Sequence, residues 1–261
     1  MVTVAATETT ALGDPESLGE GRNGKPRVSV VVPAMNEAKN LPYVLARVPA
    51  DVYEVVLVDG NSTDGTVEVA RELFPTVRIV GQDRRGKGNA LACGFAACRG
   101  DIIVMLDADG SADPQEIAHF VRALQNGADF AKGSRFLPGG GSADITRMRR
   151  LGNAFLGSLV NLLYGTRYTD LCYGYNAFWV HCLPHMSVDC DGFEVEALIN
   201  IRVAKAGLEV AEVPSYEKLR INGESNLHTF RDGFRVLKTI LRERFRRTTN
   251  RRESVAVQVP T

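Results

Sequence analysis

The chain has 261 residues, of which 44% are apolar and 24% are charged, proportions that are ordinary for a globular protein with a sizeable core. Lysine plus arginine equals aspartate plus glutamate at 31 each, so the net charge does not indicate nucleic-acid binding, and we expect no nucleic-acid partner. The five cysteines have no paired CxxC spacing and no apolar run is long enough for a transmembrane helix, which together favour a cytoplasmic protein over a disulfide-bonded or membrane-spanning one.

Both ends of the chain lack hydrophobic periodicity. We expect residues 1–26 to be a disordered leader and residues 248–261 a disordered tail, and the first residues do not have the pattern of a signal peptide. Residues 27–247 would then form a single folded domain.

Short apolar runs alternate with helical patterns in the first half of this domain. The runs predict strands at 28–32, 54–58, 77–80, 101–106 and 128–132, and helices are expected between them at 38–48, 62–74, 88–98 and 114–124. Such alternation is typical of βαβ units, so we predict an α/β fold with a mostly parallel, Rossmann-like sheet flanked by helices. Ligands of such sheets bind beyond the carboxyl ends of the strands.

The pattern changes after residue 134. Helices are expected at 146–164, 194–206 and 228–246, with a strand near 209–214. In the last helix, Phe230, Phe234 and Phe245 recur at helical spacing and arginines interleave with them. A basic amphipathic helix of this kind can lie on an anionic membrane, or its apolar side can pack on the domain.

Two carboxylates follow the buried run Ile102–Leu106. Asp107 and Asp109 stand where this strand should end, and at that edge of a sheet they could hold Mg2+ or Mn2+ against a diphosphate. The alternative is a strand-end turn with acidic caps, because so short a pattern recurs by chance.

Other strand ends carry polar or special residues as well. Pro33 would fix the turn after the first strand, and Asn36 and Glu37 could bind a ribose or a base. Asp59 could accept a hydrogen bond from a base. The alternatives are a helix-start acid for Glu37 and a turn former for Asp59.

Cationic side chains could serve phosphate groups. Lys87 lies between two glycines, where little side-chain bulk would block a phosphate, although a solvated loop lysine is the alternative. Arg135 offers a planar fork for a phosphate. Arg149 and Arg150 follow at the start of a predicted helix, where a solvated basic face is the alternative.

Four motifs in order carry a resemblance to a known family. They are Val30-Val-Val-Pro-Ala-Met-Asn-Glu37, Val58-Asp-Gly-Asn-Ser-Thr-Asp-Gly65, Gly86-Lys-Gly-Asn-Ala-Leu91 and Asp107-Ala-Asp109. With them the chain resembles the family 2 glycosyltransferases of the GT-A fold, and among these the dolichol- or polyprenyl-phosphate sugar synthases. The resemblance implies that Asp109 coordinates Mg2+ or Mn2+, that Asp107 lies beside the metal or the ribose, and that Ala108 lines the donor site. It also implies that arginines near Arg135, Arg149 and Arg150 bind an acceptor phosphate.

Later segments extend the resemblance to about residue 240. The segment Asp170-Leu-Cys-Tyr-Gly-Tyr-Asn-Ala177 is similar to the family segment that shapes the sugar and acceptor pocket. The run Glu194-Val-Glu196 is similar to the Phe-x-x-Glu element of the family near that pocket, and the resemblance places Glu194 at the acceptor. Arg220 matches the Arg-x-x-Gly-x-Ser loop that closes over the diphosphate. Ser111 and Asn226 depart from residues often found in the family, which bears on the metal shell and on the closure of this loop.

Three functions remain open from the sequence. The favoured one is an inverting transfer of a hexose from a UDP- or GDP-sugar to a polyprenyl phosphate at the cytoplasmic membrane face, with Asp109, Arg135, Asp170 and Arg220 as the catalytic group. The second is transfer to a soluble hydroxyl acceptor, for which Asp170, Asp191 or Glu194 would have to act as the base. The third, a nucleotidyltransferase or a nucleotide-binding module, lacks the glycine-rich basic loop expected after the first strand.

Overall fold

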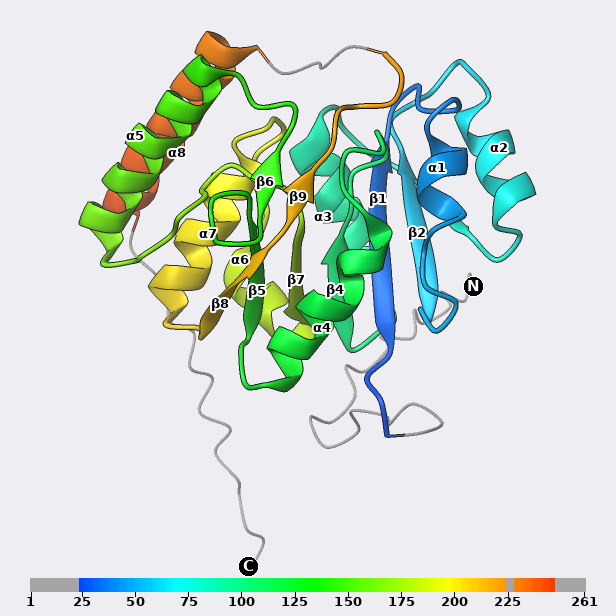
Figure 1. Cartoon of the computed structure of the whole chain (residues 1–261), viewed down its shortest axis with the longest axis horizontal. Coiled ribbons are helices and arrows are strands. Elements are labelled where there is room, and N and C mark those ends of the chain that lie inside the picture. Colours follow the sequence, from blue (N-terminus) through cyan, green and yellow to red (C-terminus); the bar gives the residue numbers. More distant parts are fainter. Residues whose placement is uncertain (1–23, 224–227, 247–261) are drawn as a thin grey trace, which may run out of the picture.

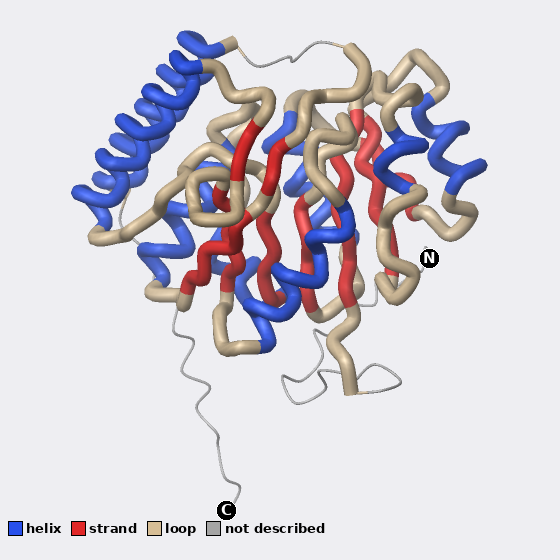
Figure 2. The backbone as a smooth tube through the Cα atoms, viewed as in Figure 1, coloured by secondary structure: helices blue, strands red, loops and turns tan. Residues whose placement is uncertain are grey.

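The computed structural model describes residues 24–223 and 228–246, so nearly all of the expected leader and the whole of the expected tail lie outside the described residues. A central sheet of seven strands carries helices on both faces (Figures 1 and 2). The strands are β1 (Val28–Ala34), β2 (Glu54–Asp59), β3 (Arg78–Gly81), β4 (Ile102–Met105), β5 (Phe130–Ser134), β6 (Gly141–Ser142), β7 (Asn176–Trp179), β8 (Val210–Pro214) and β9 (Tyr216–Glu217). The α-helices are α1 (Leu41–Leu45), α2 (Thr66–Leu73), α3 (Lys87–Ala97), α4 (Ile117–Gln125), α5 (Arg147–Tyr164), α6 (Leu183–Met186), α7 (Val195–Ala206) and α8 (Thr229–Phe245), with 3-10 turns η1 (Pro114–Glu116) and η2 (Val180–Cys182).

The strand order of the central sheet is β3-β2-β1-β4-β7-β5-β8, and β6 pairs with β9 in a separate ribbon. All neighbours in the central sheet are parallel except β7, which runs antiparallel to both β4 and β5. The predicted α/β fold with a mostly parallel sheet is therefore confirmed. The sequence did not predict β7, because Asn176–Trp179 continues a segment that reads as pocket-forming loop.

Strand β1 lies between two parallel neighbours, which explains its continuous valine run. Val30 and Val32 pack into the core on one face of the sheet, and Val31 packs into the core on the other face. Because β4 pairs with β1 only as far as Val31, the chain beyond Met105 is free to leave the sheet. This divergence opens the edge at which the two carboxylates of the Asp107-Ala-Asp109 motif lie.

A third apolar cluster joins α5, α7 and α8. Leu156 and Val160 of α5 meet Ile201 of α7 and Val236 and Ile240 of α8. Helices α5 and α8 lie side by side at one end of the sheet, and both begin near the edge where the parallel strands end (Figure 1). None of the described helices combines the length and the apolar character needed to cross a bilayer.

Helix α1 is shorter than the 38–48 span predicted from the sequence. The chain from Asn36 to Asn40 forms turns instead, with Asn36 in the left-handed region at φ 58° and the Asn40 amide donating to the Glu37 carbonyl at 2.9 Å. Pro42 then occupies the first turn of the helix, where its missing N–H costs nothing. The polar residues after β1 are therefore held in a tight turn at the sheet edge.

Candidate active site

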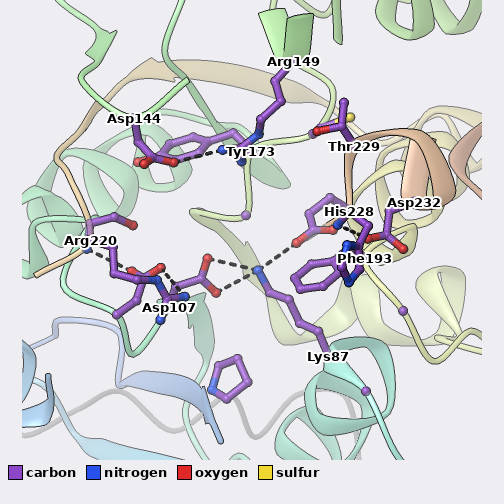
Figure 3. Close-up of a pocket in the computed structure, with 18 of the residues that line it drawn as sticks. Lys87, Asp107, Asp144, Arg149, Tyr173, Phe193, Arg220, His228, Thr229 and Asp232 are labelled. Atoms are coloured by element: carbon purple, nitrogen blue, oxygen red, sulfur yellow. Dashed lines mark hydrogen bonds and ion pairs between the residues drawn. The ribbon is translucent and has the colours of Figure 1, made fainter. Parts of the chain in front are cut away.

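A cavity of about 950 Å3 opens at the sheet edge where β1 and β4 end. Pro33 lies near the end of β1, Glu37 follows that strand, and residues 107–109 follow β4; all five line the cavity. The remaining walls come from the start of α3, the segment 172–174, the start of α7, the loop after β9 and the first turns of α5 and α8 (Figure 3). One cavity thus connects the strand ends to the helix pair α5 and α8.

A cluster of three charges lies at the centre of this cavity (Figure 3). The Lys87 ammonium is 2.8 Å from Asp107 Oδ1 and 2.8 Å from Glu196 Oε1. Burial would lower the pKa of Lys87, but the two carboxylates outweigh burial and raise that pKa well above its usual range. Burial also raises the pKa of the Glu196 carboxyl, with Lys87 opposing the shift. The lysine therefore stays cationic in a fixed position.

Three glycines allow the segments that carry this cluster to pack closely. A Cβ added at Gly174 would lie 2.9 Å from Lys87 Nζ and 3.3 Å from Asp107 Oδ2. A Cβ at Gly86 or Gly88 would run into the backbone carbonyls of residues 191 and 190, at 2.0 and 2.3 Å. The glycines on either side of the lysine therefore serve the packing of α3 against the segment before α7, which is a reason that the sequence alone did not indicate.

Arg220 connects the loop after β9 to the turns that follow β1 and β4. Its guanidinium is 2.8 Å from Glu37 Oε1 and 3.1 Å from Asp109 Oδ2. Asn222 holds the same loop down, since its backbone and side-chain amides both donate to Asn40 Oδ1 at 3.0 Å. The Lys218 amide adds a bond of 2.7 Å to the Ser111 carbonyl. The predicted closing loop thus lies over the two strand ends, whereas Asn226 falls outside the described residues.

Arg135 lies in the cavity wall and makes two buried ion pairs. Its Nε and Nη2 donate to Asp170 at 2.7 and 3.0 Å, and Nη1 donates to Glu217 at 3.1 Å. Arg135 is only 6% exposed and Asp170 is fully buried. Burial opposes ionisation of Asp170, yet the Arg135 hydrogen bonds hold the pKa of that carboxyl below its usual value. The guanidinium fork is therefore already engaged by protein carboxylates.

The cavity gathers most of the residues predicted for the site. In its lining are Pro33, Glu37, Lys87, Asp107, Ala108, Asp109, Arg135, Arg149 and Arg220. Arg149 also donates to Asp144, another lining residue, at 2.9 Å. The assigned roles of these residues stay predictions.

Five predicted residues lie outside the lining. Asn36 and Asp59 cap the neighbouring turn, where they accept from the amides of Thr63 and Ser62 at 2.8 and 3.2 Å, and Asp170 is buried behind the wall. Arg150 is exposed and its guanidinium lies 5.2 Å from the centre of the Phe136 ring. Glu194 has a buried Oε2 without a hydrogen-bond partner among the described residues.

Some lining residues were not predicted as site residues. Glu196, Gly174, Tyr173, Phe193 and His228 all face the cavity. The spacing Phe193-x-x-Glu196 was a usable signal for the glutamate, because it matches the Phe-x-x-Glu element better than Glu194 does. Nothing in the sequence indicated His228, because its place in the cavity lining depends on how α8 packs on the domain.

The carboxylates of this site fit a divalent cation in part. Asp107 and Asp109 supply hard oxygen donors, the type that Mg2+ and Mn2+ prefer. Within residues 24–223 and 228–246, no three His, Cys, Asp or Glu side chains gather as a complete ligand set. Two carboxylates with substrate phosphates and water completing the shell is an arrangement typical of Mg2+ in phosphate-handling enzymes.

An open α/β sheet with paired carboxylates and cations at its strand ends is the architecture of a GT-A nucleotide-sugar transferase. The family model for glycosyl transferase family 2 matches residues 29–198, and the chain belongs to this family. The resemblance stated from the four sequence motifs is thereby confirmed, and the protein is a glycosyltransferase.

Relatives and solved structures agree with this assignment. The chain is 32% identical over 214 residues to the undecaprenyl-phosphate mannosyltransferase of Micrococcus luteus, covering 77% of this chain and 87% of that protein. It is 31% identical over 210 residues to the dolichol-phosphate mannosyltransferase of Pyrococcus furiosus, covering 77% of this chain but only 59% of that longer protein.

The fold is also similar to a solved structure. It resembles glucosyl-3-phosphoglycerate synthase from Mycobacterium tuberculosis in complex with Mn2+, UDP and glucosyl-3-phosphoglycerate, with a TM-score of 0.67, 23% identity and coverage of 92% of this chain and 88% of that chain. At this identity the likeness concerns the fold.

Proposed function

We propose that the protein transfers a hexose from a UDP- or GDP-sugar to a polyprenyl phosphate at the cytoplasmic face of a membrane, with inversion at the anomeric carbon. The two relatives named above, a dolichol-phosphate and an undecaprenyl-phosphate mannosyltransferase, support this acceptor class.

The observation that carries the proposal is the mixed chemistry of the cavity end formed by α5 and α8. Arg149 and Arg235 line it together with the apolar side chains of Leu156 and Val236. Cations beside an apolar wall suit a phosphate attached to a hydrocarbon chain. The first turns of both helices also point their partial positive charge toward this end.

The donor belongs at the opposite end, between the ends of β1 and β4. Glu37, Asp107, Asp109, Lys87 and Arg220 meet there. Asp107 and Asp109 would hold Mg2+ or Mn2+, which when bound supplies Lewis-acid stabilisation of the departing diphosphate. Asn36 and Asp59, in the turns beside this end, are the residues we assign to the ribose and the base.

The reaction needs no general base, since a phosphate monoester is already anionic at neutral pH. A phosphate oxygen attacks the anomeric carbon while the bond from that carbon to the diphosphate oxygen breaks, and the nucleoside diphosphate leaves with the electron pair. The residues of the chain act by positioning and by charge. Arg220 and the fixed Lys87 ammonium offset negative charge on the leaving group, while Arg149 orients the acceptor phosphate. Arg135 and Asp170 hold the wall between the two ends.

A soluble hydroxyl acceptor is the second candidate, because the structural neighbour is named for phosphoglycerate glucosylation. A hydroxyl acceptor requires a base. Of the three carboxylates considered for that task, Asp170 is fully buried against Arg135, and Asp191 is bound by Arg84 at 3.0 Å. Glu194 does not line the cavity. This arrangement favours an acceptor that is already ionised.

The test is a donor panel with an extraction step. Labelled UDP- and GDP-sugars are incubated with the protein, Mg2+ or Mn2+ and polyprenyl phosphate, and the organic phase is counted. We expect label in the organic phase with sugars of one nucleotide, and its loss in Asp109→Asn. Nucleotide release without extractable label would transfer support to the soluble acceptor, and no turnover with any donor would contradict the proposal.

A further inference from the structure

Helix α8 has one buried side and one exposed apolar side. Asp232, Val236, Ile240 and Glu243 are buried against the rest of the domain. On the opposite side, at spacings of four and three residues, run the apolar side chains of Phe230, Phe234, Leu237, Leu241 and Phe245. Four of these five are exposed, and Phe245 is 84% exposed. The helix therefore carries an exposed apolar stripe, of which Leu237 packs partly against the third apolar cluster.

Helix α5 repeats this arrangement beside it. Its inward side buries Asn153, Leu156, Gly157 and Val160. Its outward side exposes Met148, Leu151, Phe155 and Leu162, again at helical spacing. Eight of the fifteen large apolar side chains exposed in the described residues lie on these two helices, four on each. Helices α5 and α8 lie side by side, and we call their exposed apolar sides together the α5/α8 face.

The charged side chains that the two helices themselves expose all have one sign. The exposed charged residues of the two helices are Arg147, Arg150, Arg231, Arg235, Lys238, Arg242 and Arg244. The two acids of α8, Asp232 and Glu243, are buried. Neither of the helices exposes an acidic side chain within its described residues. The apolar surface is thus surrounded by cations.

This charge pattern distinguishes the two main classes of occupant. In a symmetric pair of chains the same patch meets itself, so the cations of one copy would face those of the other. An anionic bilayer instead offers hydrocarbon to the apolar stripe and headgroup phosphates to the cations. With α5 about 27 Å long at the helical rise per residue, the face suits a helix pair that lies along a membrane rather than across it.

We propose that the α5/α8 face docks on an anionic lipid bilayer and so delivers the acceptor phosphate directly into the cavity. The proposal rests on the proposed lipid acceptor. The N-terminal parts of both helices line the proposed acceptor end of the cavity, through Arg149, Leu156 and Val236. Docking of the face would therefore bring a lipid phosphate in the membrane surface to the N-terminal ends of the two helices, where the cavity begins, while the sugar donor enters from the sheet side.

The experiment measures binding of the full chain to sedimented vesicles of phosphatidylcholine alone and of equal parts phosphatidylcholine and phosphatidylglycerol. We expect binding to the anionic vesicles that weakens with salt, and little binding to the neutral ones. The double variant Phe234→Ser, Phe245→Ser should lower the ratio of bound to free protein by about tenfold or more, since binding scales with buried apolar area. Lys238→Glu with Arg244→Glu should lower it on anionic vesicles only.

Matched controls come from helix α2 at the other end of the sheet. Leu73→Ser and Arg71→Glu change exposed residues of the same chemistry and should leave vesicle binding unchanged. Circular dichroism checks that each variant is folded. Equal binding by the wild type and by both α8 double variants would overturn the proposal.

A second measurement separates this inference from the proposed function. With a short-chain, water-soluble prenyl phosphate, the Phe234→Ser, Phe245→Ser variant should keep wild-type activity and lose it only on long-chain polyprenyl phosphate in vesicles. Vesicle binding without any transfer to prenyl phosphates would refute the proposed acceptor but leave the docking face standing. If light scattering instead shows a stable dimer that the phenylalanine changes convert to monomers, the face is an interface between two copies and the proposal fails.

Discussion

At the scale of single residues, the site depends on one glycine that leaves room for three charged side chains. Gly174 leaves the space in which Lys87, Asp107 and Glu196 approach one another, with Lys87 Nζ only 2.9 Å from where a Cβ would stand. The lysine is in turn fixed by two carboxylates at 2.8 Å. The position of the Lys87 ammonium should therefore be sensitive to the addition of one methyl group at residue 174.

Gly174→Ala should lower kcat/KM by about a hundredfold, because displacement of a positioned group by an ångström has effects of that order. The fold should survive, with a change in unfolding free energy of less than about 1.5 kcal/mol. Steady-state kinetics and urea denaturation measure the two quantities. Gly157→Ala in α5 is the matched control, since its Cβ would meet only the Leu171 Cβ at an ordinary 3.9 Å. Full activity in Gly174→Ala would refute the role of the three-charge cluster.

Arg220→Ala should reduce kcat by about 10²- to 10³-fold, the usual effect of losing one group that stabilises developing charge. The loss should appear with every donor that carries a diphosphate. Lys218→Ala is its control, because Lys218 lies in the same segment but pairs with Asp113 at 2.9 Å and does not line the cavity. Equal activity of the two variants would remove Arg220 from the leaving-group end.

The sequence predicted the cavity lining at the sheet edge better than the rest of the lining. Glu37, Asp107, Asp109 and Arg220 could be named because strand ends and short motifs fix their place along the chain. Glu196 was missed in favour of Glu194, since both share one helix start and only the rotation of α7 decides which carboxylate enters the cavity. Such a rotation depends on tertiary packing, which no local pattern contains.

At the scale of secondary-structure elements, one buried arginine connects three segments. Arg135 follows β5, Asp170 begins the segment before β7, and Glu217 ends β9. The Arg135 guanidinium also lies 4.8 Å from the centre of the Tyr173 ring in the cavity wall. Through these contacts Arg135 holds this part of the cavity wall in place.

Arg135→Met should lower the free energy of unfolding by about 3–5 kcal/mol, because it leaves the buried Asp170 carboxylate without its partner. Urea denaturation measures the loss. Arg84→Met, which breaks the exposed pair with Asp191, should leave the free energy of unfolding nearly unchanged. Unchanged stability together with a raised KM for the acceptor would show instead that Arg135 contacts the acceptor phosphate directly.

Most of the elements could be predicted from the sequence, and the exceptions have physical reasons. The parallel strands and the long helices follow from apolar runs and helical periodicity. Strand β7 has only four residues, and Asn176 at its start is buried, so its period is too short to detect. The outward stripe of α5 was equally compatible with a buried helix, because its sequence carries apolar residues on both sides.

At the scale of the whole molecule, several carboxylates are held ionised by arginines. Burial opposes ionisation of Asp170, Glu243, Asp101 and Glu54, but hydrogen bonds from their partners hold the pKa of each below its usual value. A carboxyl group with a lowered pKa in the folded state stabilises the fold above its unfolded pKa. That contribution is lost as the pH falls through the folded pKa.

The free energy of unfolding should therefore decline as the pH falls below the unfolded values of 3.8 for aspartate and 4.5 for glutamate. Urea denaturation at neutral pH and at successively lower pH measures the decline. Asp170→Asn should show a shallower dependence than the wild type, because one of the linked groups is gone. Stability that is constant through this range would contradict the assignment of these carboxylates as ionised partners.

The proposed function places the nucleotide sugar at the sheet-edge end of the cavity and the lipid phosphate at the end formed by α5 and α8. The most direct test of this account is a competition assay in one reaction. Polyprenyl phosphate and 3-phosphoglycerate are offered together with the labelled donor that supports turnover, and the label is counted in the organic and aqueous products. The account predicts that the label partitions into the organic phase and that Arg149→Ala lowers this fraction. Label that accumulates in the aqueous glycoside, with the organic phase empty, would contradict it.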